Sequence, residues 1–109
     1  MKINELMFQG LECVQAASGD VEITGGYTSD LLSDVMAHLK EGDALITIQA
    51  HKNTIAVAAL TGASAVILCH GRVASPDMLT VAVKENIAVF ISSGSQYETT
   101  VKLARALRV

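Results

Sequence analysis

Four short polar segments carry most of the side chains that could bind or react with a small molecule. They are residues 24–30, 49–53, 70–72 and 92–95, and each borders an apolar run. In open α/β sheets, ligands bind beyond the carboxyl ends of the strands, where helix N-termini present free N–H groups. We therefore expect the four segments to meet at one edge of a sheet and to form a ligand site there.

The Gly25-Gly26 pair predicts a loop whose backbone N–H groups can approach a carboxylate or phosphate closely. Thr28 or Ser29 is expected to cap the following helix. In the alternative interpretation the glycines only form an ordinary turn. The segment lacks the Gly-Lys-Ser/Thr sequence of a phosphate loop and the three-glycine spacing of a dinucleotide-binding fingerprint. The predicted ligand-binding residues are Thr24, Gly25, Gly26, Thr28, Ser29, Gln49, His51, Asn53, Ser92 and Ser93.

His51 and Cys69 are the side chains that most resemble catalytic groups. A histidine base needs an orienting carboxylate, and no acidic residue lies between Asp43 and Asp77. We therefore interpret His51 as a hydrogen-bonding or helix-capping residue. Cys69 ends an apolar run, where the pKa of a thiol is usually raised. The sequence predicts no catalytic residue and no enzyme, and phosphoester hydrolase or transferase activity is the weakest alternative.

The histidines and cysteines show no spacing typical of a metal site. Asp30 and Asp34 are one helical turn apart and could bind a cation together, although such a pair is more often a solvated helix face. We therefore predict neither a metal nor a cofactor.

Apolar runs and helical patterns alternate along the chain and would position these segments. Near-continuous apolar runs, typical of parallel strands covered on both faces, occur at residues 44–48, 65–69 and 87–91. Helices are predicted over residues 31–39 and 55–60, the second apolar nearly all round and hence the most buried. Ser75-Pro76-Asp77 is a helix-start signature, and Ser95 with Glu98 forms a capping box.

The last helix and the first 26 residues complete the predicted arrangement. The inner face of the last helix is expected to comprise Val101, Ala104 and Leu107. A short helix is expected over residues 4–8, with strands at 11–15 and 21–24. The alternation predicts one α/β domain over residues 1–109, with three α/β/α layers around a mixed, mainly parallel sheet.

The composition excludes several protein classes. Half of the 109 residues are hydrophobic and 17% are charged, so a core can form without disulfides. The formal net charge of −3 and the dispersed basic residues argue against nucleic-acid binding. Polar residues interrupt the longest uncharged stretch, residues 53–70, so we expect no membrane span and no membrane partner. Two cysteines and no signal-peptide pattern indicate reduced thiols and a cytoplasmic location.

Two stretches resemble the DRTGG domain family. Residues 22–37 read EITGGYTSDLLSDVMA, and residues 41–51 read EGDALITIQAH, with Asn53 after them. The resemblance covers nearly the whole chain and is weaker after about residue 85. It implies a domain like the N-terminal domain of HPr kinase, which also accompanies CBS domains in regulated pyrophosphatases and occurs in long phosphotransacetylases. In those settings the family is regulatory or dimer-forming.

The chain departs from the motif at two positions. Glu22 and Ile23 stand where the family has Asp and Arg. Without the arginine, a bidentate grip on phosphate is lost there, although the Gly25 and Gly26 amides could still bind an anion. The resemblance implies a non-catalytic regulatory or ligand-binding homodimer that senses a nucleotide or other small anion. An adaptor or dimerisation subunit that docks onto a separate partner enzyme is the alternative.

Overall fold

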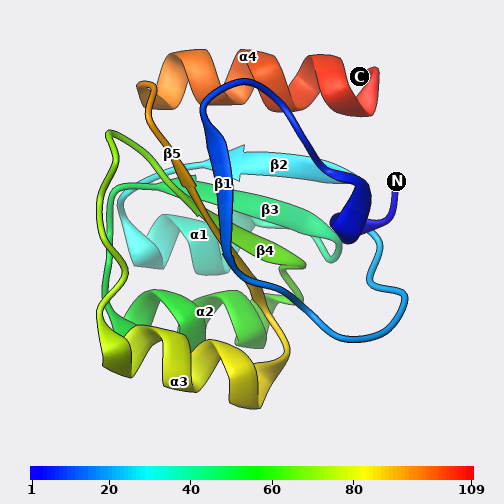
Figure 1. The fold of residues 1–109 in the computed structure, drawn as a ribbon. Coiled ribbons are helices and arrows are strands. Elements are labelled where there is room, and N and C mark those ends of the chain that lie inside the picture. Colours follow the sequence, from blue (N-terminus) through cyan, green and yellow to red (C-terminus); the bar gives the residue numbers. More distant parts are fainter.

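A five-stranded sheet with the strand order β1-β5-β4-β3-β2 forms the centre of the molecule (Figure 1). The structure, a computed structural model, describes residues 1–109. The strands are β1 (Leu11–Gln15), β2 (Gly25–Thr28), β3 (Asp43–Thr47), β4 (Ala65–Leu68) and β5 (Ala88–Ser92). β2 to β5 run parallel, and β1 pairs antiparallel with β5. The predicted mixed, mainly parallel sheet is confirmed.

Helices cover both faces of this sheet. Figure 1 shows α1 (Leu32–His38), α2 (Lys52–Thr61) and α3 (Pro76–Glu85) on one face and α4 (Gln96–Leu107) on the other. The segment before β1, with a short 3-10 helix at Ile3–Glu5, packs on the same face as α4. The predicted three-layer α/β/α arrangement is therefore confirmed. None of the α-helices has the length and apolar character that crossing a lipid bilayer requires.

Two hydrophobic clusters fill the space between the layers. Successive residues of β3 face opposite sides of the sheet. Leu45 accordingly packs with Val35, Ile55 and Met78 from the three-helix layer, whereas Ile46 packs with Leu103 of α4. Because both faces are covered, every residue of β3 and β4 is buried. This burial explains the continuous apolar runs in the sequence.

Two helices begin where the sequence predicts. Ser75 Oγ accepts a hydrogen bond from the Met78 N–H (3.1 Å) at the start of α3. At α4, Ser95 Oγ accepts from the Glu98 N–H (3.1 Å), and Glu98 Oε1 accepts from the Ser95 N–H (2.9 Å). The predicted N-cap and capping box are confirmed.

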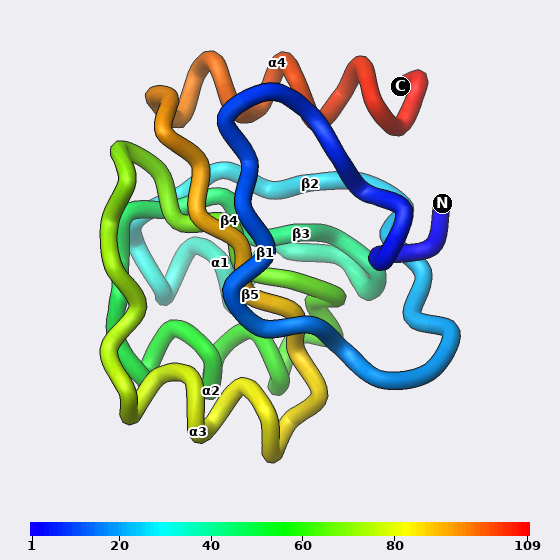
Figure 2. The backbone as a smooth tube through the Cα atoms, viewed as in Figure 1, coloured from blue at the N-terminus to red at the C-terminus, as the bar shows by residue number.

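The first 26 residues differ in part from the prediction. The strand expected at residues 11–15 is β1, but the strand expected at 21–24 is wrong, since β2 begins at Gly25. Within 21–24, Glu22 makes only an isolated antiparallel bridge to Lys2. The helix expected over residues 4–8 is reduced to the 3-10 turn at Ile3–Glu5. Figure 2 follows the long connection from β1 to β2, which lie at opposite ends of the strand order.

The expectations about helix burial differ in outcome. α2 has more buried residues than any other helix, as predicted, namely Thr54, Ile55 and Ala58, although it lies in an outer layer and Leu60 is 72% exposed. The inner face predicted for α4 is wrong in part: its buried apolar residue is Leu103, while Val101 and Ala104 are only half-buried and Leu107 packs, half-buried, against the same cluster. The helix is therefore rotated so that Leu103 points at the sheet.

Candidate functional site

The C-terminal edge, defined here as the end of the sheet where β2 to β5 terminate, is organised around Asp30. Asp30 Oδ1 accepts hydrogen bonds from Thr47 Oγ1 (2.9 Å), the Ile48 N–H (3.0 Å) and Gln96 Nε2 (3.0 Å). The carboxylate thereby joins the end of β2 to the end of β3 and to the first residue of α4. The sequence analysis missed this role, because none of its donors is close to Asp30 in the chain.

Gln49 extends this network to His51. Gln49 Nε2 donates to the Asp30 carbonyl oxygen (2.9 Å), and Gln49 Oε1 lies 3.0 Å from His51 Nε2. His51 occupies the N-cap position of α2, but its side chain makes no capping hydrogen bond. The hydrogen-bonding interpretation of His51 is thus confirmed, and side-chain capping is wrong, since the ring contacts Gln49 instead.

The N-terminus of α2 differs from those of α3 and α4. Serines cap α3 and α4, and each of these helices carries an acidic residue in its first turn. α2 has neither a capping side chain nor a first-turn acid. Its first residues, Lys52 and Asn53, are exposed. Their N–H groups and the positive end of the helix dipole are therefore free to meet an anion.

The Thr24-Gly25-Gly26 segment lies at the opposite edge of the sheet, so the predicted shared ligand surface is wrong. Gly25 and Gly26 are the first residues of β2 and align with Asp43 and Ala44 at the start of β3. The Thr24 N–H donates to the Gly42 carbonyl (3.0 Å). Because β2 and β3 are parallel, their beginnings lie a full strand length away from Gln49 and His51.

Close packing accounts for both glycines. A Cβ atom at Gly25 would lie 2.7 Å from Asp43 Oδ1, and one at Gly26 would lie 2.8 Å from Leu103 Cδ2. Both positions are part of a strand, not of an anion-binding loop. Their role is to let β3 and α4 approach β2 closely.

Thr28 and Ser29 lie at the C-terminal edge, as predicted, but do not cap a helix. The N-cap of α1 is Leu31, without a side-chain capping bond. Ser29 Oγ accepts from the Leu31 N–H (3.2 Å) before the helix begins. Thr28 Oγ1 lies 2.7 Å from Thr100 Oγ1 of α4. Capping by either residue is therefore wrong, although both stand beside the Asp30 network.

Ser92 and Ser93 stand apart from this group. Ser92 is buried, and its hydroxyl lies 2.7 Å from Thr99 Oγ1. The Ser93 N–H donates to the Gly10 carbonyl (3.0 Å), which places Ser93 toward β1. Strand β4 separates β5 from β3. Of the predicted residues, the structure brings together Thr28, Ser29, Gln49, His51 and Asn53 at the ends of β2 and β3.

Asp30 and Asp34 do not form the cation pair that their spacing allowed. Asp34 instead accepts a hydrogen bond from Tyr27 Oη (2.6 Å) and pairs with His38 Nδ1 (3.1 Å). The hydrogen bond from the Tyr27 hydroxyl is the main reason why the pKa of Asp34 lies below its usual value. The same hydrogen bond raises the pKa of Tyr27. No group of three His, Cys, Asp or Glu side chains is placed to hold a metal ion.

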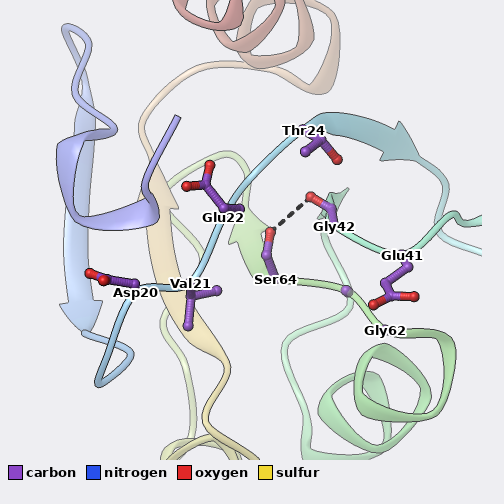
Figure 3. Close-up of a pocket in the computed structure, with 9 residues that line it drawn as sticks. Asp20, Val21, Glu22, Thr24, Glu41, Gly42, Gly62 and Ser64 are labelled. Atoms are coloured by element: carbon purple, nitrogen blue, oxygen red, sulfur yellow. Dashed lines mark hydrogen bonds between the residues drawn. The ribbon is translucent and has the colours of Figure 1, made fainter.

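An open cavity of about 520 Å³ lies at the other end of the strands (Figure 3). Asp20, Glu22 and Glu41 line it, and no basic side chain does. The Glu22 carboxylate pairs with the N-terminal ammonium (3.2 Å), and Asp20 pairs with Lys2 (3.3 Å). The lining is acidic, so this cavity is unsuited to an anion.

Cys69 directly follows β4 and is a free, buried thiol in the hydrophobic cluster that also contains Leu103 of α4. Burial raises its pKa. Cys13 on β1 is exposed, and partial burial of its thiol also raises its pKa. Neither environment favours the thiolate that a nucleophile needs.

No protein-family model matches this chain, and no curated protein matches it by sequence. Among solved structures, the chain is similar in fold to the CBS and DRTGG domains of the regulatory region of Clostridium perfringens pyrophosphatase, complexed with the activator diadenosine tetraphosphate. The TM-score is 0.68 at 16% sequence identity, over 89% of this chain and 43% of that chain. The chain has a DRTGG-like fold. It therefore corresponds to less than half of the pyrophosphatase fragment.

The two departures from the DRTGG motif have structural explanations. Ile23 is fully buried in the cluster beneath α4, where an arginine would bring an unpaired charge into the core. Glu22 is exposed and pairs with the N-terminal ammonium. In this DRTGG-like fold, neither position is equipped to hold a phosphate.

Proposed function

We propose that this chain is a non-catalytic regulatory module that binds a small anionic ligand at the first turn of α2. The observation that carries the proposal is that α2 alone, among the three longer helices, begins without a capping side chain or an acid. Two free N–H groups and the Lys52 ammonium could donate to one phosphate or carboxylate group. His51, held by Gln49, stands next to them.

The distribution of charge supports this location over the Gly25-Gly26 segment. Basic side chains follow the strand ends at the C-terminal edge, namely His51, Lys52, His70 and Arg72. The cavity at the opposite edge is lined by acids. The Lys52 ammonium attracts an anion to the first turn of α2, where the nearest carboxylate, Asp30, already accepts three hydrogen bonds, whereas the acidic lining of the cavity repels one.

A nucleotide is the ligand class to test first. The pyrophosphatase regulatory region of similar fold was crystallised with a dinucleoside polyphosphate activator. Such compounds carry the phosphate groups that helix N-termini bind. The proposal includes a single DRTGG-like domain over residues 1–109 and a cytoplasmic location, in keeping with two free cysteines.

Thermal unfolding in the presence of phosphate, pyrophosphate, AMP and diadenosine tetraphosphate tests the proposal. A ligand that binds only the folded chain raises Tm in proportion to ln(1 + [L]/Kd). We expect at least one of these anions to raise Tm at millimolar concentration, and Lys52→Ala to reduce the effect. Lys84→Ala, on α3, is the matched control. If none of the four raises Tm, or if both variants respond like the wild type, the proposed site is wrong.

A dimerisation or adaptor subunit is the second candidate, favoured by one observation. β2 terminates the sheet and pairs only with β3. An unpaired strand edge can add a strand from another chain. Analytical ultracentrifugation over a range of concentrations tests the homodimer, and a monomer at every concentration would contradict it. Co-purification of one specific enzyme with the tagged chain from its native cell would instead identify an adaptor.

A further inference from the structure

Asp43, the first residue of β3, carries a negative charge that no positive side chain compensates. It is only 9% exposed, and none of the ion pairs in the molecule includes it. Its Oδ2 accepts a hydrogen bond from the Lys40 N–H (2.9 Å), whereas its Oδ1 has no donor. Because an unpaired charge is costly to remove from water, the free oxygen of this nearly buried carboxylate indicates a place for a positively charged group.

The free oxygen opens onto a groove beside α1. No fully buried side-chain oxygen in the molecule lacks a hydrogen-bond partner, so the small exposed part of Asp43 includes Oδ1. The open groove has a volume of about 580 Å³, and Gly25, Tyr27, Lys40 and Glu41 line it together with Asp43. A volume of this size is within the range of small-molecule sites.

Gly25 keeps Oδ1 accessible from the groove. It lies opposite Asp43 in the register of β2 and β3, and a Cβ atom at this position would be 2.7 Å from Oδ1. Any larger residue would therefore press against the oxygen and cover it. The glycine that allows β2 and β3 to pack closely also leaves one carboxylate oxygen free for a ligand.

The other charged groups of the groove do not replace the missing positive charge. His38 is already paired with Asp34. Lys40 and Glu41 are neighbours in the chain, are both exposed and carry opposite charges, so their effects on the groove offset each other. The negative charge of Asp43 remains, and a ligand with a single positive charge would neutralise it.

We propose that this groove binds a small molecule through one primary ammonium group, which donates to Asp43 Oδ1. A guanidinium group binds a carboxylate best through both oxygens, and Oδ2 is already occupied. Calcium and magnesium ions need about six oxygen ligands, and no group of three acidic, His or Cys side chains is placed to hold a metal ion. An ammonium group is a compact charge that one free oxygen can accept.

This site is separate from the proposed anion site. Asp43 and Gly25 begin their strands, whereas α2 starts beyond the end of β3, at the opposite edge of the sheet. The ammonium site goes beyond the proposed function and does not rest on it.

Titration with ethylammonium chloride, followed by backbone amide chemical shifts in NMR spectra, tests the site. We expect saturable shifts at Gly25, Gly26 and Asp43. Sodium chloride at the same ionic strength is the control for screening, and ethanol is the uncharged analogue of similar size. If the shifts do not saturate, or if sodium chloride or ethanol reproduces them, the proposal is wrong.

Asp43→Asn removes the charge and keeps an oxygen that can accept from the Lys40 N–H. It should weaken ethylammonium binding by about tenfold or more, because the ligand loses a charge-assisted hydrogen bond. Asp77→Asn makes the same change of charge at an exposed residue of α3 and should bind like the wild type. Lys52→Ala should also bind ethylammonium normally, which separates failure of this site from failure of the anion site. Unchanged affinity in Asp43→Asn would overturn the proposal.

Gly25→Ala tests the same site without changing a charge. The added methyl group covers Oδ1 and should abolish the shift of Asp43 on titration. Far-UV circular dichroism checks that the variant is folded. A folded Gly25→Ala that binds ethylammonium with wild-type affinity would show that the ligand does not contact Oδ1. If Gly25→Ala does not fold, the comparison of Asp43→Asn with Asp77→Asn decides.

Discussion

A Cβ atom at Gly26 would lie 2.8 Å from Leu103 Cδ2, so α4 packs directly on the backbone of β2. Leu103 is only 2% exposed and belongs to the cluster on that face of the sheet. Gly26→Ala should therefore displace the buried Leu103 side chain and lower the free energy of unfolding by about 1–3 kcal/mol. Urea denaturation followed by circular dichroism measures the change.

A double-mutant cycle checks that the contact with Leu103 causes the loss. Leu103→Ala alone should cost about 2–5 kcal/mol, because it leaves a cavity. In that background the additional Gly26→Ala change should cost clearly less than in the wild type. Additive losses would show that some other contact opposes a side chain at position 26.

Asp30 should contribute to stability as an acceptor. Thr47 is fully buried, and its hydroxyl donates to Asp30 Oδ1. Asp30→Ala leaves that donor without its partner, which costs about 1–3 kcal/mol. Asp30→Asn keeps an oxygen in place and should lose less. The midpoint of urea unfolding measures the loss of stability in both Asp30 variants. Asp20→Ala, which removes one partner of an exposed ion pair, is the control, and its unfolding midpoint should stay close to that of the wild type.

The Tyr27–Asp34 hydrogen bond should make stability depend on acidity. Because the bond lowers the pKa of Asp34 in the folded state, its contribution is present above the unfolded-state pKa of about 3.9 and is lost as the pH falls through the folded-state value. Tyr27→Phe should therefore reduce the unfolding free energy most near neutral pH, with the difference shrinking below about pH 4. Tyr97→Phe, at an exposed side chain, should show no such trend. A Tyr27→Phe difference that stays constant across this range would contradict the assignment.

Local signals in the sequence account for the parts of the fold that were predicted well. The starts of α3 and α4 depend on Ser75 and Ser95, whose partners are three residues away. The position of β2 depends on pairing across about 18 residues, Gly25 with Asp43. Glycine has a low strand propensity, so local pattern favoured residues 21–24 instead. Tertiary pairing decided this element, and it moved the glycines to the opposite edge from the one predicted.

The candidate site was harder to predict, for the same reason. Asp30 receives a donor from Gln96, 66 residues later in the chain. In the sequence, the spacing of Asp30 and Asp34 suggested only that Asp30 is a solvated carboxylate or that it binds a cation together with Asp34. Whether His51 caps α2 also depends on which way its ring turns, and it turns to Gln49. The sequence located the polar segments, while long-range contacts determined which of them meet.

Supplying α2 with a cap should distinguish an empty anion site from an ordinary helix start. In His51→Asp, a carboxylate at the N-cap position can accept from the first-turn N–H groups and interact with the helix dipole. We expect the unliganded variant to gain about 0.5–2 kcal/mol in unfolding free energy. It should also lose the Tm increase caused by phosphate compounds, because its own carboxylate occupies the site. His38→Asp makes the same substitution at an exposed histidine in the last turn of α1, beside Gly25 at the opposite edge of the sheet, and it should keep the ligand response. If His51→Asp were more stable and still responded fully to the anion, the ligand would have to bind elsewhere than the first turn of α2.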